Sequence, residues 1–138
     1  MTLLLHLRIT GVLLLALATL HFALPKRLGW DEDLARLTLV NRQIFLVHTF
    51  FIVLVLVMMG VLSLFFGPVL VAPTPLARLV LGGLTLFWLI RLVMQWLVYD
   101  PSLWRGDRFN TRVHYAFTAL WIYFSTVYGA AFWAQLKG

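Results

Sequence analysis

Long apolar runs, separated by short polar segments, return four times along the chain. An α-helix rises about 1.5 Å per residue, so about 20 residues cross a hydrocarbon core of roughly 30 Å. This periodicity predicts an all-α fold, an integral membrane four-helix bundle that forms one domain over residues 1–138. The four predicted spans cover about residues 3–24, 43–66, 79–99 and 113–135.

Helix-breaking residues set the limits of these spans. Gly67-Pro68, Pro73 and Pro75 follow the second span, and proline ends helices because it lacks the backbone N–H and clashes with the preceding turn. Asp100-Pro101 ends the third span. Before the fourth span, Asp107 or Asn110 is a candidate N-cap.

The flanks of the first two spans carry further signals. Residues 1–18 resemble a signal peptide with Ala16-Leu17-Ala18 as the cleavage-like site, and we expect this segment to be retained as a helix. We expect the second helix to begin outside the lipid, over about residues 30–40. Its acidic start, residues 31–33, suits a helix N-terminus, where the macrodipole favours anions.

Basic residues are distributed unevenly between the segments that flank the spans. Two connecting segments, residues 25–42 and 100–112, hold seven Lys or Arg residues, and the termini with the segment 67–78 hold three. The positive-inside rule then places the two basic segments in the cytoplasm and both termini outside an inner (plasma) membrane. Anionic lipid head groups are the expected partners of these basic loops.

Composition agrees with a membrane protein and excludes several classes. Hydrophobic residues make up 62% of the chain and charged residues 12%, about half the charged share of an ordinary soluble domain. The net charge of +6 does not indicate nucleic-acid binding, because the basic residues form no stripe with interleaved aromatics. The absence of cysteine excludes disulfides and thiolate-bound metals.

None of the four spans contains Asp or Glu. Proton-coupled exporters and cation pumps need an intramembrane carboxylate, and di-iron bundles need several. The sequence therefore disfavours these classes.

The remaining polar residues fall on helical stripes, since steps of three, four or seven residues return to one face. Lipid does not favour polar faces, so we expect the stripes to point into the bundle. The third span carries Trp88, Arg91, Gln95 and Tyr99. The fourth carries His114, Thr118, Trp121, Ser125 and Tyr128; the second aligns Asn41, His48, Val55 and Met59; the first aligns Thr10 and His21.

Three histidines from three helices, His21, His48 and His114, fall in the basic half of the predicted bundle. Two facing histidines hold a b-type haem in many helical bundles, so these three are candidate haem ligands. A zinc or copper ion bound by the three imidazoles is an alternative, although no His-x-x-x-His spacing supports it. Ordinary hydrogen bonds between helices are the structural alternative.

Arg91 lies deep in the third span, where a charge requires a partner. Backbone carbonyls, Tyr99, Asp100 or an anionic ligand are the candidates. With Gln95, these side chains form a predicted polar wall for an anionic or carbonyl group, and Trp88 and Trp121 are candidates to line it.

The sequence thus predicts a small polytopic membrane protein that binds a cofactor or an amphiphilic ligand in its cytoplasmic half. In its most specific form, this prediction names haem b as the cofactor and gives the protein a redox role. A non-catalytic subunit of a larger membrane complex and an oligomeric small transporter or channel are the alternatives. No catalytic residue can be assigned, so we favour a binding protein over an enzyme.

Overall fold

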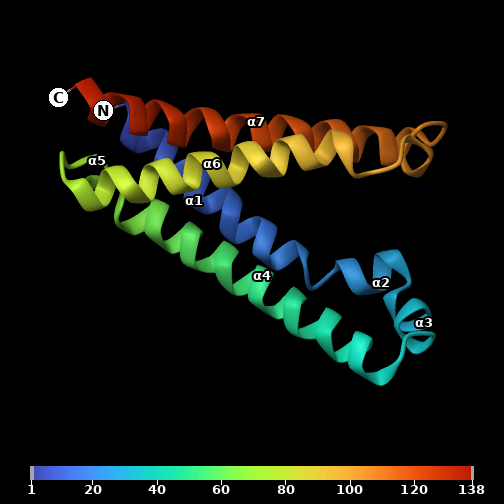
Figure 1. The fold of residues 1–138 in the computed structure, drawn as a ribbon. Coiled ribbons are helices and arrows are strands. Elements are labelled where there is room, and N and C mark those ends of the chain that lie inside the picture. Colours follow the sequence, from blue (N-terminus) through green and yellow to red (C-terminus); the bar gives the residue numbers. More distant parts are fainter. Residues whose placement is uncertain (1, 138) are drawn as a thin grey trace. The chain divides into compact units, whose positions relative to one another are not determined.

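The computed structural model describes residues 2–137, which are helical with short turns and contain no strand (Figure 1). The predicted domain's first and last residues, 1 and 138, lie outside this range. The elements are α1 (Thr2–Leu20), α2 (Leu24–Leu28), α3 (Trp30–Ala35), α4 (Leu39–Phe65), α5 (Gly67–Val71), α6 (Pro75–Leu97), the 3-10 turn η1 (Pro101–Leu103) and α7 (Arg108–Lys137).

Within residues 2–137, three helices are long and apolar enough to cross a membrane: α1, α4 and α6. This agrees with the prediction of an integral membrane protein. The fourth predicted span forms the 30-residue helix α7. Its tryptophan, tyrosine, hydroxyl and amide side chains make it less hydropathic than the other three, so its membrane crossing is still a prediction.

The first helix is shorter than predicted, since α1 ends at Leu20 and not at residue 24. Single-turn hydrogen bonds follow over residues 21–23 before α2 begins. Pro25 explains the break, because it has no N–H to donate to the carbonyl of His21 four residues earlier and its ring clashes with that carbonyl in a continuous helix.

The expected continuous start of the second helix is wrong. The acidic residues 31–33 do lie in a first helical turn, but that turn belongs to the separate helix α3. The side chain of Thr38 accepts the backbone N–H of Asn41 at 3.4 Å and caps a new helix, α4. A capping threonine has non-helical backbone angles, so α3 and α4 cannot be continuous.

Capping side chains mark the starts of both α6 and α7, and α6 begins at Pro75, before the predicted third span at about residue 79. Thr74 caps α6 by accepting the N–H of Ala77 at 3.2 Å, and Pro75 occupies the first turn, where its missing N–H costs nothing. Asp107, one of the two predicted caps of α7, accepts the N–H of Asn110 at 2.6 Å.

The chain divides into two compact units, residues 7–67 and residues 1–6 with 68–138. In the first unit, α1 and α4 approach closely at two glycines. A Cβ atom on Gly11 would lie 2.7 Å from the backbone nitrogen of Leu64, and one on Gly60 would lie 2.9 Å from Leu15. The two backbones touch here because neither glycine carries a side chain.

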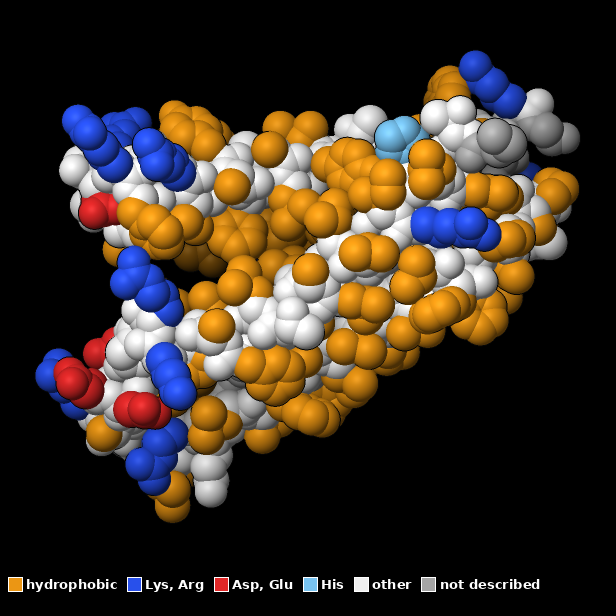
Figure 2. Space-filling model, turned by 180° about the vertical axis from the view of Figure 1, so that it is seen from behind, with side chains coloured by type: hydrophobic (Ala, Val, Ile, Leu, Met, Phe, Trp, Pro, Cys, Tyr) orange, Lys and Arg blue, Asp and Glu red, His pale blue; other side chains and the backbone are white. Residues whose placement is uncertain are grey.

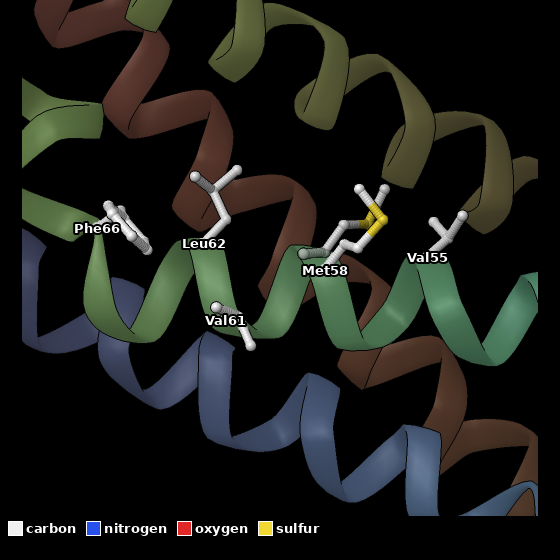
Figure 3. Close-up of a pocket in the computed structure, with 6 residues that line it drawn as sticks. Val55, Met58, Val61, Leu62 and Phe66 are labelled. Atoms are coloured by element: carbon white, nitrogen blue, oxygen red, sulfur yellow. The ribbon is translucent and has the colours of Figure 1, made fainter.

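The same unit carries a shallow apolar groove on α4 (Figure 3). Val55, Met58, Leu62 and Phe66 line one side of the helix, at spacings of three and four residues. The groove offers no polar group to a ligand and is suited to contact with lipid chains.

In the second unit, α6 and α7 pack side by side along their length (Figure 1). Trp88 of α6 and Phe124 and Tyr128 of α7 are fully buried between them. At one end, Gln135 donates to the carbonyls of Leu70 and Ala72 at 2.7 Å each, which ties the end of α7 to the segment around α5.

Hydrophobic side chains cover most of the visible helix surface in Figure 2, and Lys, Arg, Asp and Glu gather at the helix ends. An apolar middle with charged ends matches the layered polarity of a bilayer.

Candidate polar site on α6 and α7

The predicted polar stripes of the third and fourth spans meet in one hydrogen-bonded row. Arg91 Nη1 donates to Gln95 Oε1 at 3.2 Å, and the indole N–H of Trp121 donates to the same oxygen at 3.1 Å. On the other side of the amide, Gln95 Nε2 lies 3.1 Å from His114 Nδ1. Gln95, His114 and Trp121 are buried, as expected for residues that do not face lipid.

The orientation of the Gln95 amide follows from its neighbours. A guanidinium and an indole have only donors, so the atom that faces Arg91 and Trp121 must be the amide oxygen. The amide nitrogen therefore faces His114 and donates a hydrogen to Nδ1. A flipped amide would set donors against donors on one side of Gln95.

This orientation selects the tautomer of His114. Because Nδ1 accepts from Gln95, the ring hydrogen of the neutral imidazole must lie on Nε2. His114 is only 5% exposed, and its Nε2 is a buried atom without a hydrogen-bond partner. The site therefore contains a buried N–H group that has no acceptor.

Aromatic rings surround His114. Trp104 stacks on it with a centroid distance of 4.1 Å and an interplanar angle of 9°. Trp96 and Tyr115 stand nearly perpendicular to it, at 4.9 Å and 5.7 Å. The indole N–H of Trp104 is a second buried donor without a partner. Among the described residues, neither this indole N–H nor His114 Nε2 has a hydrogen-bond partner.

Trp104 is held in place by the turn between α6 and α7. Asp100 accepts the backbone N–H of Ser102 at 2.8 Å and caps η1. The hydroxyl and the backbone N–H of Ser102 hold the pKa of the Asp100 carboxyl below its ordinary value. Thr111 donates to the Trp104 carbonyl at 2.6 Å, which links the turn to α7.

Within residues 2–137, Arg91 has aromatic neighbours and no ion-pair partner. Its Cζ lies 4.9 Å from the ring centroid of Trp121 and 5.7 Å from that of Tyr99. Its side-chain hydrogen bond goes to Gln95. The Asp100 carboxylate, a predicted counter-ion, instead caps η1. Asp100 as the counter-ion of Arg91 therefore stays a prediction.

The two tryptophans of the predicted wall stack on each other. The rings of Trp88 and Trp121 lie 5.1 Å apart at an angle of 18°. Trp121 uses its indole N–H on Gln95, whereas that of Trp88 is buried without a partner. The stacking on Trp121 indicates that Trp88 serves to pack α6 against α7. After His114 Nε2 and the Trp104 indole, its N–H is the third buried donor of this region without a partner.

The other two candidate haem ligands belong to the unit of residues 7–67. His21 Nδ1 lies 2.8 Å from the Leu17 carbonyl, and His48 Nδ1 lies 2.8 Å from the Ile44 carbonyl. A carbonyl only accepts, so each Nδ1 carries a hydrogen, and Nε2 of each ring keeps a lone pair when the ring is neutral. Metal-bound histidines use this tautomer, and His114 has the opposite one. Within residues 2–137, no three His, Cys, Asp or Glu side chains gather at a metal-binding spacing.

Sequence reasoning did not find Trp104 as part of the site. Its position near a predicted membrane interface indicated a place in an aromatic belt. Only the path of η1, which returns the ring to His114, reveals the contact. No local sequence signal encodes that path, although the Asp100-Pro101-Ser102 turn motif is visible.

No protein-family model, curated protein or solved structure matches this chain.

Proposed function

We propose that this chain is a small membrane protein that binds the anionic head of an amphiphile at Arg91, Gln95 and His114. The observation that carries the proposal is the uncompensated charge of Arg91. It lies on α6, a helix apolar enough to cross a membrane, and its contacts are one amide and two aromatic rings. An anion stabilises a cation in such a helix, and a carboxylate or phosphate head supplies one.

The neighbours of Arg91 hold the guanidinium in position for such a ligand. Gln95 binds one of its nitrogens, and the Trp121 ring lies beside its Cζ atom. Both contacts reduce the entropy that the side chain loses when an anion binds. The ring N–H groups of Trp88, Trp104 and His114 have no hydrogen-bond partner among the described residues. Each N–H group adds partial positive charge near Arg91, and none adds negative charge.

We also propose that α7 is a fourth membrane span and that both termini lie on the same side of the membrane. Residues 113–136 of α7 contain no charged side chain, and α7 packs along α6. His6 Nδ1 lies 3.0 Å from the hydroxyl of Tyr123, so the start of α1 lies against the second half of α7. Both observations support a four-span bundle, with the basic loops on the cytoplasmic side of the inner membrane.

Arg91→Gln tests this function. The probe is dodecyloxyacetate, a carboxylate amphiphile, titrated in nonionic micelles and measured by native mass spectrometry. We expect the variant to bind at least about tenfold more weakly, since hydrogen bonds to charged groups contribute about 1.5–3 kcal/mol. Arg36→Gln, which removes an exposed arginine, is the matched control. Equal binding by wild type and Arg91→Gln, or no preference for dodecyloxyacetate over uncharged dodecyloxyethanol, would refute the proposal.

Haem b is the second candidate function, with a redox role. The tautomers of His21 and His48 favour it, because both rings offer Nε2 as a lone pair in the manner of metal ligands. Protein purified from cells supplied with haem precursor should then show a Soret band that His48→Ala abolishes. A spectrum without that band would exclude this candidate and leave the amphiphile site untouched.

A further inference from the structure

We infer that His114 is an obligate hydrogen-bond donor and that the amphiphile carries a second, uncharged acceptor oxygen, of ester, amide or ketone type, which His114 recognises. The inference rests on the proposed function and names the ligand more closely. It follows from the arrangement of donors around Gln95.

The first step is the fixed direction of the Gln95–His114 bond. Arg91 and Trp121 both donate to the amide oxygen, so the amide nitrogen donates to His114 Nδ1. Gln95 is therefore a positioning residue. It keeps the hydrogen of the neutral ring on Nε2, which lies on the far edge of the imidazole from Gln95.

The second step is the state of that N–H group. His114 Nε2 is buried and has no partner, and a buried donor without an acceptor destabilises the fold. Such a group needs an explanation in a well-packed site. An acceptor supplied by a ligand satisfies it, whereas a metal cation or an ammonium head cannot, because neither accepts a hydrogen bond.

The third step is the neighbouring indole. Trp104 lies parallel to His114 at 4.1 Å and adds another N–H without a partner. Trp104 also belongs to the turn between α6 and α7 and not to either long helix. A rotation of its side chain would therefore not disturb the packing of α6 on α7. The aromatic walls favour an acceptor attached to an apolar chain over a hydrated ion.

Two probes that differ by one carbonyl isolate this contact. 8-(Lauroyloxy)octanoate and 8-(dodecyloxy)octanoate are carboxylates of equal chain length, and the first has an ester where the second has an ether. The carbon chain between the two polar groups lets one molecule extend from Arg91 past Gln95 to the far edge of His114. Wild-type protein should bind the ester roughly fivefold more tightly, the effect of one neutral hydrogen bond.

His114→Asn removes the donor and keeps an acceptor for Gln95 near the position of Nδ1. It should abolish the preference for the ester over the ether. His114→Gln, whose amide reaches the position of Nε2, should restore part of the preference. Arg91→Gln should weaken both probes equally and keep their ratio.

A second readout uses the unmodified protein, so it does not depend on how the variants fold. Nitrogen-15 spectra of histidine-labelled protein distinguish a protonated ring nitrogen from an unprotonated one. We expect the hydrogen of neutral His114 on Nε2, with Nδ1 unprotonated. A hydrogen on Nδ1 would overturn the inference.

The binding results distinguish a failure of this inference from a failure of the proposed function. If both probes bind through Arg91 with equal affinity, the inference fails and the proposed function stands. If neither probe binds, or binding does not depend on Arg91, both fail.

Discussion

Gln95→Leu is expected to lower the free energy of unfolding by about 3 kcal/mol or more, the largest effect of any single substitution in the α6–α7 pair. Leucine fills a similar volume but leaves Arg91 and Trp121 without their shared acceptor and His114 without its donor. Each buried polar group that loses its partner costs about 1–3 kcal/mol, and a charged group costs more. Unfolding in mixed micelles with increasing dodecyl sulfate measures the change.

Gln43→Leu is the matched control, because Gln43 lies exposed near the start of α4. It should change the unfolding midpoint little. A Gln95→Leu protein as stable as the control would show that the three hydrogen bonds do not stabilise the fold.

Gly11→Ala is expected to destabilise the α1–α4 contact by about 1–3 kcal/mol, the usual cost of overpacking. The new Cβ would lie 2.7 Å from the Leu64 nitrogen and 2.8 Å from the Gly60 carbonyl oxygen. Both are backbone atoms, so no side-chain rotation relieves the overlap, and the two helices must separate. The same unfolding measurement applies, with a cysteine-linked fluorescent pair reporting the α1–α4 distance.

Gly83→Ala is the control for this prediction. Gly83 also lies inside a helix, but a Cβ on it meets no atom within 4 Å. Alanine there should be neutral or stabilise α6 by up to about 1 kcal/mol through helix propensity. If Gly11→Ala behaves like Gly83→Ala, the close approach of α1 to α4 is absent from the protein.

The glycine contact illustrates what the sequence could not predict. Gly11 and Gly60 stand alone in their helices and form no Gly-x-x-x-Gly pattern. Their importance depends on the register between α1 and α4, which no local pattern specifies. The adjacent Gly82-Gly83 pair is more conspicuous in the sequence, yet Gly83 has open space around it.

The polar row was predicted better, because helical periodicity specifies a face directly. Trp88 and Gln95 are seven residues apart, and so are His114 and Trp121, and all four are buried on α6 and α7. Periodicity cannot specify which atom donates to which. That information came from the shared acceptor of Arg91 and Trp121, and it distinguishes His114 from the other two histidines of the predicted cluster.

The ends of the helices were also predicted from the sequence only in part. A capping signal predicted the start of α7 correctly, whereas the start of α6 at Pro75 was not predicted, since Pro75 was interpreted only as a breaker of the preceding helix. The early end of α1 was missed because the apolar run continues through Ala23 and Leu24 without a sequence break. Apolar composition alone does not distinguish a helix from the turn before Pro25.

Chemical analysis of what the purified protein carries tests the central claim most directly. The protein is purified from membranes in a nonionic detergent, extracted with organic solvent, and the extract is quantified by mass spectrometry. We predict an anionic amphiphile in near-stoichiometric amount in the wild type and in Arg36→Gln, and about tenfold less in Arg91→Gln. Equal amounts of every anionic amphiphile in all three proteins would contradict a binding site at Arg91.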